Sequence, residues 1–284
     1  MKEMSNNSSV VLGLAQMSMQ EDEASNLSKA IEMIEGAAKF GAEIVCLPEL
    51  FASRYFPQEK DAKNDAQTIP GPITESLSRC ARKNSVCLVG GSIFEKEHDK
   101  TYNTSVVFDN KGKILGKYRK VHIPQDESFY EQNYFVSGKE YKVFNTSKAK
   151  IGVLICFDQW YPEPARALRL LGSQIVFYPT AIGNVKGIEQ MEGDWKESWI
   201  AVQRGHAISN GMIISAVNRV GAEGRMKFWG SSFVCDEFGK ILAKAGGKEE
   251  ILVVKCDLNL GEEVEEGWGF LRNRKPATYG NLIR

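Results

Sequence analysis

The sequence predicts an α/β protein built from two similar halves, each with a β-sheet and outer helices. Short apolar, β-rich runs alternate with longer amphipathic stretches, and the second half repeats the pattern of the first. Strand-like segments also outnumber those of a plain βαβ alternation. Two sheets that face each other between helical layers therefore fit the pattern better than one doubly wound sheet.

The first half opens with an apolar run, Val10–Gln16, that is typical of a buried strand. The next stretch, Glu21–Phe40, has apolar residues at helical spacing, and Gly41 ends it. One more helix and four more strands are predicted in this half. They are the strand Glu43–Leu47, the helix Pro72–Lys83, and the strands Ser85–Phe94, Thr101–Asp109 and Ile114–Arg119, with a hairpin turn at 109–112.

The second half is predicted to begin with the strand Lys150–Cys156 and the helix Pro162–Leu171, which has proline in its opening turn. The remaining elements are the strand Gln174–Tyr178, the helix Trp195–Ser209, the strand Met212–Asn218, and the strands Ser231–Cys235 and Ile251–Cys256, which close a further sheet. The linkers are short and contain no low-complexity segment. We therefore expect one domain over residues 9–280, preceded by a polar tail at residues 1–8.

The composition of the 284 residues restricts the partners and the compartment. Thirty-six basic and 36 acidic residues give a formal charge of zero, which argues against nucleic-acid binding and favours self-association. The early apolar run is too short for an export signal or a membrane span, so we expect a cytoplasmic protein that has no membrane partner. The six cysteines form no CxxC pair and read as reduced, mostly buried thiols.

Several common chemistries are excluded by missing motifs. The three histidines have no ligand spacing from a cysteine pair, so no metal site is expected. The chain has no GxxxxGK[ST] phosphate loop and no GxSxG elbow. A start of a dinucleotide fingerprint at Gly267-Trp268-Gly269 lacks its third glycine and follows no strand. We therefore expect no cofactor.

Three segments place a reactive side chain at the end of a predicted strand, where α/β sheets bind ligands. Glu49 follows Pro48 amid apolar residues, so partial desolvation would raise its pKa and suit it to act as a base. Lys120 ends a basic stretch. Cys156 ends an apolar strand before a helix, where helix-start N–H groups and a cation would stabilise a thiolate. Each residue also has a simpler interpretation: an exposed loop acid, a solvated cation and an inert buried thiol.

Together these segments resemble the nitrilase superfamily of carbon–nitrogen hydrolases, and most closely its N-carbamoylputrescine amidase branch. The resemblance runs from Val10 to Tyr279. Its most specific stretches are Leu47–Phe51, Tyr118–Pro124, Cys156–Glu163 and Phe177–Gly183. The ordered set of Glu49, Lys120 and Cys156, 71 and then 36 residues apart, carries most of its weight.

The resemblance implies a fold, an assembly and a set of site residues. The fold is a four-layer α-β-β-α sandwich that dimerises through helices, so a homodimer or a larger homo-oligomer built from dimers is expected. Glu49, Lys120 and Cys156 would form the catalytic triad. Glu131 matches a second family glutamate, which positions the substrate and the triad. The oxyanion donors would be Lys120 and the backbone N–H of Phe157.

The implied activity is that of a cofactor-free thiol amidohydrolase acting on a small-molecule ureide or amide. The first hypothesis is cleavage of N-carbamoylputrescine to putrescine, ammonia and carbon dioxide through a covalent thioester on Cys156. The second is an N-carbamoyl-amino-acid hydrolase or an ω-amidase of the same superfamily. The third is an inactive member that acts as a binding or scaffold subunit, and the intact triad argues against it.

The substrate pocket is less strongly indicated by the sequence. Tyr55, Tyr130 and Trp160 are candidate pocket walls, and ordinary core packing is the alternative for each. Two acids in the segment 187–195, Glu189 and Glu192, are candidates to bind a cationic amine, or simply suit the start of the following helix. Arg54, placed near the pocket mouth, would instead favour an acidic substrate.

Overall fold

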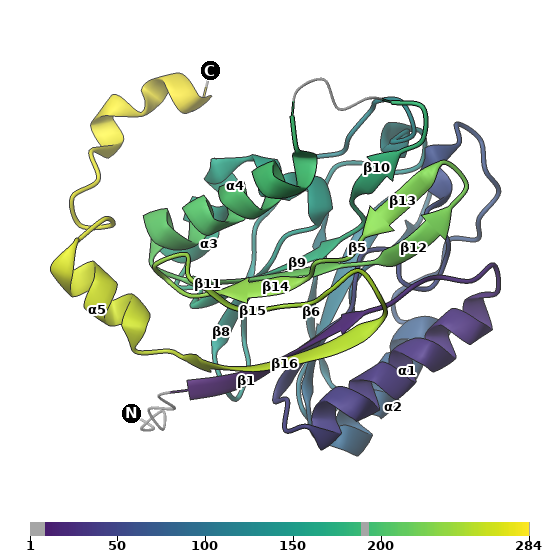
Figure 1. Ribbon diagram of the computed structural model, residues 1–284, viewed down its shortest axis with the longest axis horizontal. Helices are drawn as coiled ribbons and strands as arrows, with labels where there is room; N and C mark the ends of the chain where they lie inside the picture. The colour runs from purple at the N-terminus through teal and green to yellow at the C-terminus, as the bar shows by residue number, and fades with distance from the viewer. Residues whose placement is uncertain (1–8, 189–192, 284) are drawn as a thin grey trace.

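Two β-sheets pack face to face, and a pair of helices covers the outer side of each sheet (Figure 1). The computed structural model describes residues 9–188 and 193–283. The predicted four-layer α-β-β-α sandwich is confirmed. The predicted tail at residues 1–8 lies outside the described residues. None of the helices in the described ranges is long and apolar enough to cross a bilayer.

The first sheet has seven strands in the order β16-β1-β2-β3-β5-β4, with β6 also paired to β5. Strands β1, β2 and β3 are parallel to one another, and the other pairs are antiparallel. The strands are β1 (Ser9–Gln16), β2 (Ile44–Cys46), β3 (Cys87–Val89), β4 (Ile93–Glu97), β5 (Lys100–Phe108), β6 (Ile114–Arg119) and β16 (Glu250–Asp257).

The second sheet has six strands in the order β15-β14-β11-β9-β8-β7, and its central strands β8, β9 and β11 are again parallel. Its strands are β7 (Val143–Asn145), β8 (Lys150–Val153), β9 (Ile175–Thr180), β11 (Ile213–Asn218), β14 (Phe233–Cys235) and β15 (Ile241–Lys244). A small third sheet contains β10 (Gly183–Val185), β12 (Val220–Glu223) and β13 (Met226–Trp229). This sheet was not predicted from the sequence.

The helices complete two similar halves, β1-α1-β2-α2-β3 and β8-α3-β9-α4-β11. Helices α1 and α2 pack on the first sheet, and α3 and α4 cover the second (Figure 1). The α-helices are α1 (Glu23–Lys39), α2 (Pro72–Asn84), α3 (Pro162–Leu170), α4 (Trp195–Asn210) and α5 (Leu260–Gly267). The 3₁₀ turns are η1 (Phe56–Gln58), η2 (Glu131–Asn133), η3 (Cys156–Trp160), η4 (Pro276–Thr278) and η5 (Gly280–Ile283).

Alternation of side chains along the first sheet divides the core into two layers. In β2, Ile44 and Cys46 point to the second sheet, whereas Val45 packs under α1 and α2. Because both faces of the sheet are covered, its central strands are apolar on both sides. The candidate site lies in the loops at the carboxyl ends of the buried strands β2 and β8.

Three predicted strands differ from the structure. The strand Ser85–Phe94 is two strands, β3 and β4, which both pair with β5 and are interrupted at 90–92. The strand Lys150–Cys156 is shorter in the structure: β8 ends at Val153, and Cys156 opens η3 with a positive φ of 42° that a strand cannot accommodate. The strand Ile251–Cys256 was predicted to close a sheet with Ser231–Cys235. It pairs instead with β1 in the first sheet, because its apolar residues serve both core layers.

Gly91 explains the interruption between β3 and β4. It has a φ of 57°, and a Cβ atom added there would lie 2.2 Å from the carbonyl oxygen of Pro48. The backbone of this turn therefore packs directly against the residue that precedes Glu49. A glycine is required for both the conformation and the close approach.

We expect Gly91→Ala to destabilise the protein by about 3 kcal/mol, because it adds a clash with backbone to the cost of a positive φ. Gly41→Ala is the matched control, since Gly41 has a φ of 87° with nothing within 4 Å of the added Cβ. The control should lose only about 1 kcal/mol. Urea unfolding of both variants measures the difference, and equal losses would contradict the proposed contact.

Candidate active site

The predicted triad residues come together at the carboxyl ends of the strands. Glu49 lies in the loop after β2, Lys120 directly follows β6, and Cys156 opens η3 after β8. Glu49 and Lys120 are fully buried, and Cys156 is 8% exposed. Three segments that are distant in the sequence thus converge on one small region between the two sheets.

A buried ammonium group lies between two carboxylates. Lys120 Nζ donates to Glu49 Oε1 at 2.8 Å and to the Oε1 and Oε2 atoms of Glu131 at 2.9 and 2.7 Å. All three charged groups are withdrawn from water, since Lys120 and Glu49 are fully buried and Glu131 is only 1% exposed. An ammonium has three N–H donors, and each of them is directed to a carboxylate oxygen here.

Two further side chains fix the carboxylates. Asn103, on β5, donates its amide N–H to Glu49 Oε1 at 2.8 Å. Tyr55 donates its hydroxyl to Glu131 Oε1 at 2.7 Å. Glu49 Oε2 is buried and has no hydrogen-bond partner among the described residues. One carboxylate oxygen of Glu49 is therefore anchored and the other is free to accept a proton.

The charges in this cluster shift one another's pKa values. Burial by itself lowers the pKa of Lys120, but the carboxylates of Glu131 and Glu49 outweigh it and raise that pKa above its ordinary range. Burial and the charge of Glu49 raise the pKa of Glu131 to about 7, against the opposing effect of Lys120. The ammonium is thus charged at neutral pH, while Glu131 lies close to its titration midpoint.

The thiol of Cys156 is held in its protonated form. Burial raises its pKa well above the ordinary value, and the charges of Glu49 and Glu131 raise it further, against the opposing charge of Lys120. The sequence-based prediction of a stabilised thiolate is therefore wrong for the free protein. Burial of the thiol, whose depth the sequence does not reveal, is the largest cause of the difference.

Cys156 itself has a strained backbone. Its φ of 42° lies in the left-handed region, which non-glycine residues adopt rarely, and such strain is commonly stored at functional sites. Asp158 stabilises the turn from within, because its Oδ2 accepts the backbone N–H of Ile155 at 2.9 Å. The surrounding contacts thus hold the cysteine at the first residue of η3, just after β8.

Asp158 also connects this turn to the segment that carries Lys120. Its Oδ2 accepts the hydroxyl of Tyr118 at 2.7 Å, and its Oδ1 accepts the backbone N–H of His122 at 2.9 Å. The His122 Nδ1 atom lies 2.8 Å from the same Oδ1, and the His122 ring stacks on Tyr161. One buried carboxylate therefore sets the position of the cysteine turn relative to Lys120.

A cavity of about 510 Å³ opens onto Cys156 and Glu131. Its other lining residues are mainly apolar and aromatic, with a few polar groups. They are Pro124, Gln125, Asp126, Phe129, Phe157, Trp160, Ala181, Ile182, Trp195 and Ser198. Neither lysine nor arginine is present among these described lining residues, and Asp126 brings a carboxylate. The cavity is large enough for a small organic substrate.

The predicted substrate contacts divide into three groups. Trp160 lines the cavity, as does Phe157, which was predicted as an oxyanion donor. Tyr55 is 1% exposed and lies behind Glu131, which it contacts. Tyr130 does not line the cavity, and its ring lies under the ammonium of Lys60 instead. Glu189 and Glu192 fall outside the described residues.

Arg54 does not lie at the mouth of this cavity. Its guanidinium pairs with Glu21, and it lines two surface hollows, neither of which includes Cys156. The sequence-based suggestion that Arg54 selects an acidic substrate is therefore wrong. The suggestion rested on the position of Arg54 next to Tyr55 in the sequence. Tyr55 points into the protein, whereas Arg54 points outward.

Four contributing residues were not identified from the sequence. Asp126 and Phe129 line the cavity, Asn103 holds Glu49, and Asp158 holds the cysteine turn. Asp158 was visible as an acid two residues after Cys156. Asn103 lies within a strand, where nothing in the local pattern indicates its partner. The described residues include no group of three or more potential metal ligands.

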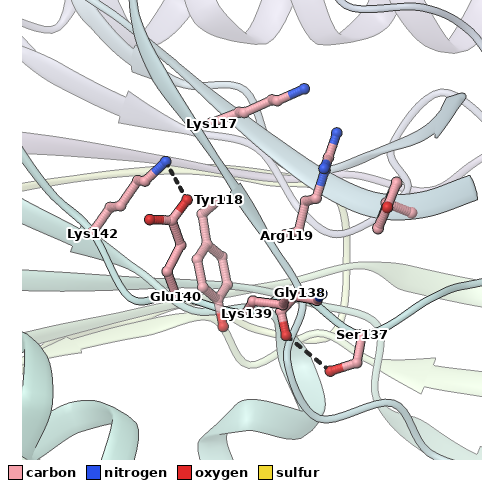
Figure 2. Close-up of a pocket in the computed structure, with 9 residues that line it drawn as sticks. Lys117, Tyr118, Arg119, Ser137, Gly138, Lys139, Glu140 and Lys142 are labelled. Carbon is pink, nitrogen blue, oxygen red and sulfur yellow. Dashed lines mark hydrogen bonds and ion pairs between the residues drawn. The ribbon is translucent and has the colours of Figure 1, made fainter. Parts of the chain in front are cut away.

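A further hollow, of about 210 Å³, lies beside β6 and the segment 137–142 (Figure 2). Figure 2 shows Lys117 and Arg119 pointing away from Lys142, which pairs with Glu140 at 2.6 Å. Lys117 and Arg119 instead pair with acidic residues of β4. Since their charges are already neutralised and no triad residue lines this hollow, we regard the cavity at Cys156 as the candidate active site.

Comparison with known proteins gives a consistent result along the chain. A model of the carbon–nitrogen hydrolase family matches residues 11–266. An N-carbamoylputrescine amidase from Solanum lycopersicum is 36% identical, with 96% of this chain and 95% of the relative covered. A citrullinase from Francisella tularensis is also 36% identical, with 97% and 98% covered. An omega-amidase from Xenopus laevis is 34% identical, with 94% and 96% covered.

Solved structures show the same fold. A carbon–nitrogen hydrolase from Helicobacter pylori has a TM-score of 0.93 and 38% identity, and the match covers 97% of this chain and 99% of that one. A variant of an amidase from Nesterenkonia sp. has a TM-score of 0.82 and 25% identity, with 97% of each chain covered. In that variant the acetamide moiety of fluoroacetamide is covalently added at the active site cysteine.

The pKa of Glu131 predicts how stability depends on pH. Because the folded-state pKa of about 7 exceeds the ordinary value of 4.5, the contribution of this group is fully present below about pH 4.5 and is lost as the pH rises through 7. Glu131→Gln removes this titration, so its unfolding free energy should fall less between pH 5 and 8, by on the order of 3 kcal/mol. Denaturant unfolding at both pH values measures this, and parallel pH profiles would contradict the shift.

Proposed function

This chain belongs to the carbon–nitrogen hydrolase family, and we propose that it is a thiol amidohydrolase that cleaves N-carbamoylputrescine to putrescine, ammonia and carbon dioxide. One observation carries the proposal. A cysteine that lines a cavity is backed by a buried carboxylate–ammonium–carboxylate cluster, and the described lining residues of that cavity include two acids, Asp126 and Glu131, but no lysine or arginine.

The first half of the reaction uses Cys156 and Glu49. The thiol is protonated in the free protein, so a base must take its proton as the sulfur attacks the carbonyl carbon of the ureide. Glu49 is suited to this role because its Oε2 atom is buried and has no other partner in the described chain. The new S–C bond gives a tetrahedral intermediate. Glu49 then returns the proton to the nitrogen that leaves as ammonia.

The tetrahedral intermediate carries a negative charge on oxygen. Phe157 is the second residue of η3, and its backbone N–H is the donor that we assign to this oxygen. Lys120 has its N–H groups engaged with Glu49 and Glu131, and it does not line the cavity. We assign to its positive charge a stabilisation of the oxyanion through space, and the direct hydrogen bond expected from the sequence stays a prediction.

The second half of the reaction releases the product. Loss of ammonia leaves a substituted carbamoyl thioester on Cys156. Glu49 takes a proton from water, whose oxygen attacks the thioester carbon, and the S–C bond breaks as the thiol regains a proton. The released carbamate decomposes to putrescine and carbon dioxide. Glu131 holds Lys120 and Tyr55 in place during both halves.

Charge in the cavity supports a substrate with a cationic distal end. N-carbamoylputrescine carries a free ammonium, for which Asp126 is the anionic partner among the described lining residues. An N-carbamoyl amino acid or an ω-amide carries a carboxylate at that end. Such a group would enter a cavity that already has carboxylates at Glu131 and Asp126, and the described lining residues offer it no lysine or arginine. Because relatives are named N-carbamoylputrescine amidase, citrullinase and omega-amidase, the charge at the distal end of the substrate is the property that decides between these substrates.

Ammonia release by the purified protein tests the proposal. The panel is N-carbamoylputrescine, citrulline, N-carbamoyl-β-alanine and glutaramate, compared by kcat/KM. We expect the highest value for N-carbamoylputrescine. A higher value for any of the other three substrates would refute the substrate assignment. If no substrate of the panel releases ammonia and iodoacetamide does not label Cys156, a binding or scaffold role would be favoured.

The covalent step predicts the effect of Cys156→Ser. The hydroxyl is a much weaker nucleophile in this setting, so ammonia release should fall below detection. Because the substitution is nearly isosteric, the free energy of unfolding should change by no more than about 1 kcal/mol. Retained turnover in a folded variant would remove Cys156 from the mechanism.

The substrate assignment predicts the effect of Asp126→Asn. Loss of the anionic partner should raise the KM for N-carbamoylputrescine by about tenfold or more, because a charged hydrogen bond typically contributes about 1.5–3 kcal/mol. Hydrolysis of N-butylurea, which has no distal ammonium, should be unchanged. Glu127→Gln is the matched control, since Glu127 is the neighbouring acid but pairs with Arg225 outside the cavity lining. Equal effects of both variants on KM would contradict the assignment.

A further inference from the structure

Arg219 is a fully buried cation that contacts the loop carrying Glu49. It directly follows β11 and is 0% exposed. Its Nη2 donates to the backbone carbonyls of Glu49 at 2.6 Å and Leu50 at 2.9 Å. The guanidinium therefore binds the backbone on which the proposed base is mounted, while the Glu49 side chain extends to Lys120.

The same guanidinium reaches the far end of this loop through Glu223. Nη1 of Arg219 lies 2.9 and 3.0 Å from the two carboxylate oxygens of Glu223. Oε2 of Glu223 accepts the backbone N–H of Tyr55 at 2.6 Å. Arg219 and Glu223 thus hold both ends of the loop 49–55, and we call this pair the loop clamp.

Both ends of the loop also enter the buried cluster. Glu49 accepts from Lys120, and Tyr55 donates to Glu131, which in turn accepts from Lys120. The contacts therefore close into a ring. Its members, in order, are Arg219, Glu49, Lys120, Glu131, Tyr55 and Glu223. A ring of this kind couples the position of the base to the position of the second carboxylate.

The loop is strained immediately after Glu49. Leu50 has a φ of 47°, in the left-handed region that a branched side chain adopts only under constraint. Two contacts supply that constraint, because Ser92 Oγ accepts the Leu50 N–H at 3.0 Å and Arg219 binds the Leu50 carbonyl. Without the clamp, relaxation of Leu50 would rotate the peptide that carries Glu49.

We propose that Arg219 is a positioning residue, which acts through the loop clamp to hold the free oxygen of Glu49 in reach of the Cys156 thiol. It does not line the cavity, and its effect is exerted on the geometry of proton transfer. This inference rests on the proposed role of Glu49 as the base. A purely structural role for Arg219 would instead lower stability and leave the folded fraction fully active.

The test uses Arg219→Lys, which keeps the charge but cannot bind two carbonyls and a carboxylate together. We expect kcat for N-carbamoylputrescine to fall by about tenfold to a hundredfold, as for a base displaced by about 1 Å, with KM within about twofold. Alkylation of Cys156 by iodoacetamide at pH 7 should slow by a similar factor, because it also needs the base. Arg225→Lys, on the surface, is the control and should change neither value.

Glu223→Gln is the second variant, in case Arg219→Lys does not fold. The amide retains an oxygen for the Tyr55 N–H but loses the ion pair, so the same fall in kcat and in alkylation rate is expected. Wild-type kcat and alkylation in either folded variant would overturn the proposal. If the wild-type protein hydrolyses nothing in the panel, the proposed substrate fails, and the alkylation rates alone decide the role of the clamp.

Discussion

The buried ammonium of Lys120, shared between Glu49 and Glu131, is the interaction on which the rest of the site depends. One cation cannot balance two carboxylates and a thiolate. The pKa of the Cys156 thiol is therefore raised, so the thiol stays protonated, and the pKa of Glu131 is raised to about 7. Because the thiol is protonated in the free protein, we propose that Glu49 takes its proton only as the sulfur attacks the substrate. Both carboxylates raise the pKa values of Lys120 and of the Cys156 thiol, so removing either carboxylate would lower both.

The fold places these groups together by repeating one arrangement twice. Each half has three parallel strands under two helices, and the loops at their carboxyl ends meet between the facing sheets. Asp158 fixes the cysteine turn of the second half to the segment of Lys120. The loop clamp fixes Glu49, from the first half, to the end of β11 in the second. The two halves therefore form the site jointly.

Much of this could be predicted from local patterns. Helical periodicity located α1 to α4 to within a few residues, and the apolar runs located the central strands. The positions of Glu49, Lys120 and Cys156 at strand ends marked them as candidates, and the family resemblance predicted that they form one catalytic triad. The third sheet and the pairing of β16 with β1 depend on long-range contacts that periodicity does not report. Asn103 and Arg219 were missed for the same reason, since their partners are distant in sequence. The expected homo-oligomer stays a prediction.

The charge state of Cys156 in the free protein is the most direct measure of this account. The difference in ultraviolet thiolate absorbance between the wild-type protein and Cys156→Ser, followed as the pH is raised from about 6 to 10, reports that residue alone. We expect no thiolate from Cys156 below about pH 9, the ordinary value for a thiol. A thiolate signal already present at pH 7 would contradict the account. It would mean that the cluster stabilises a negative charge on the sulfur, although its two carboxylates outnumber its one ammonium.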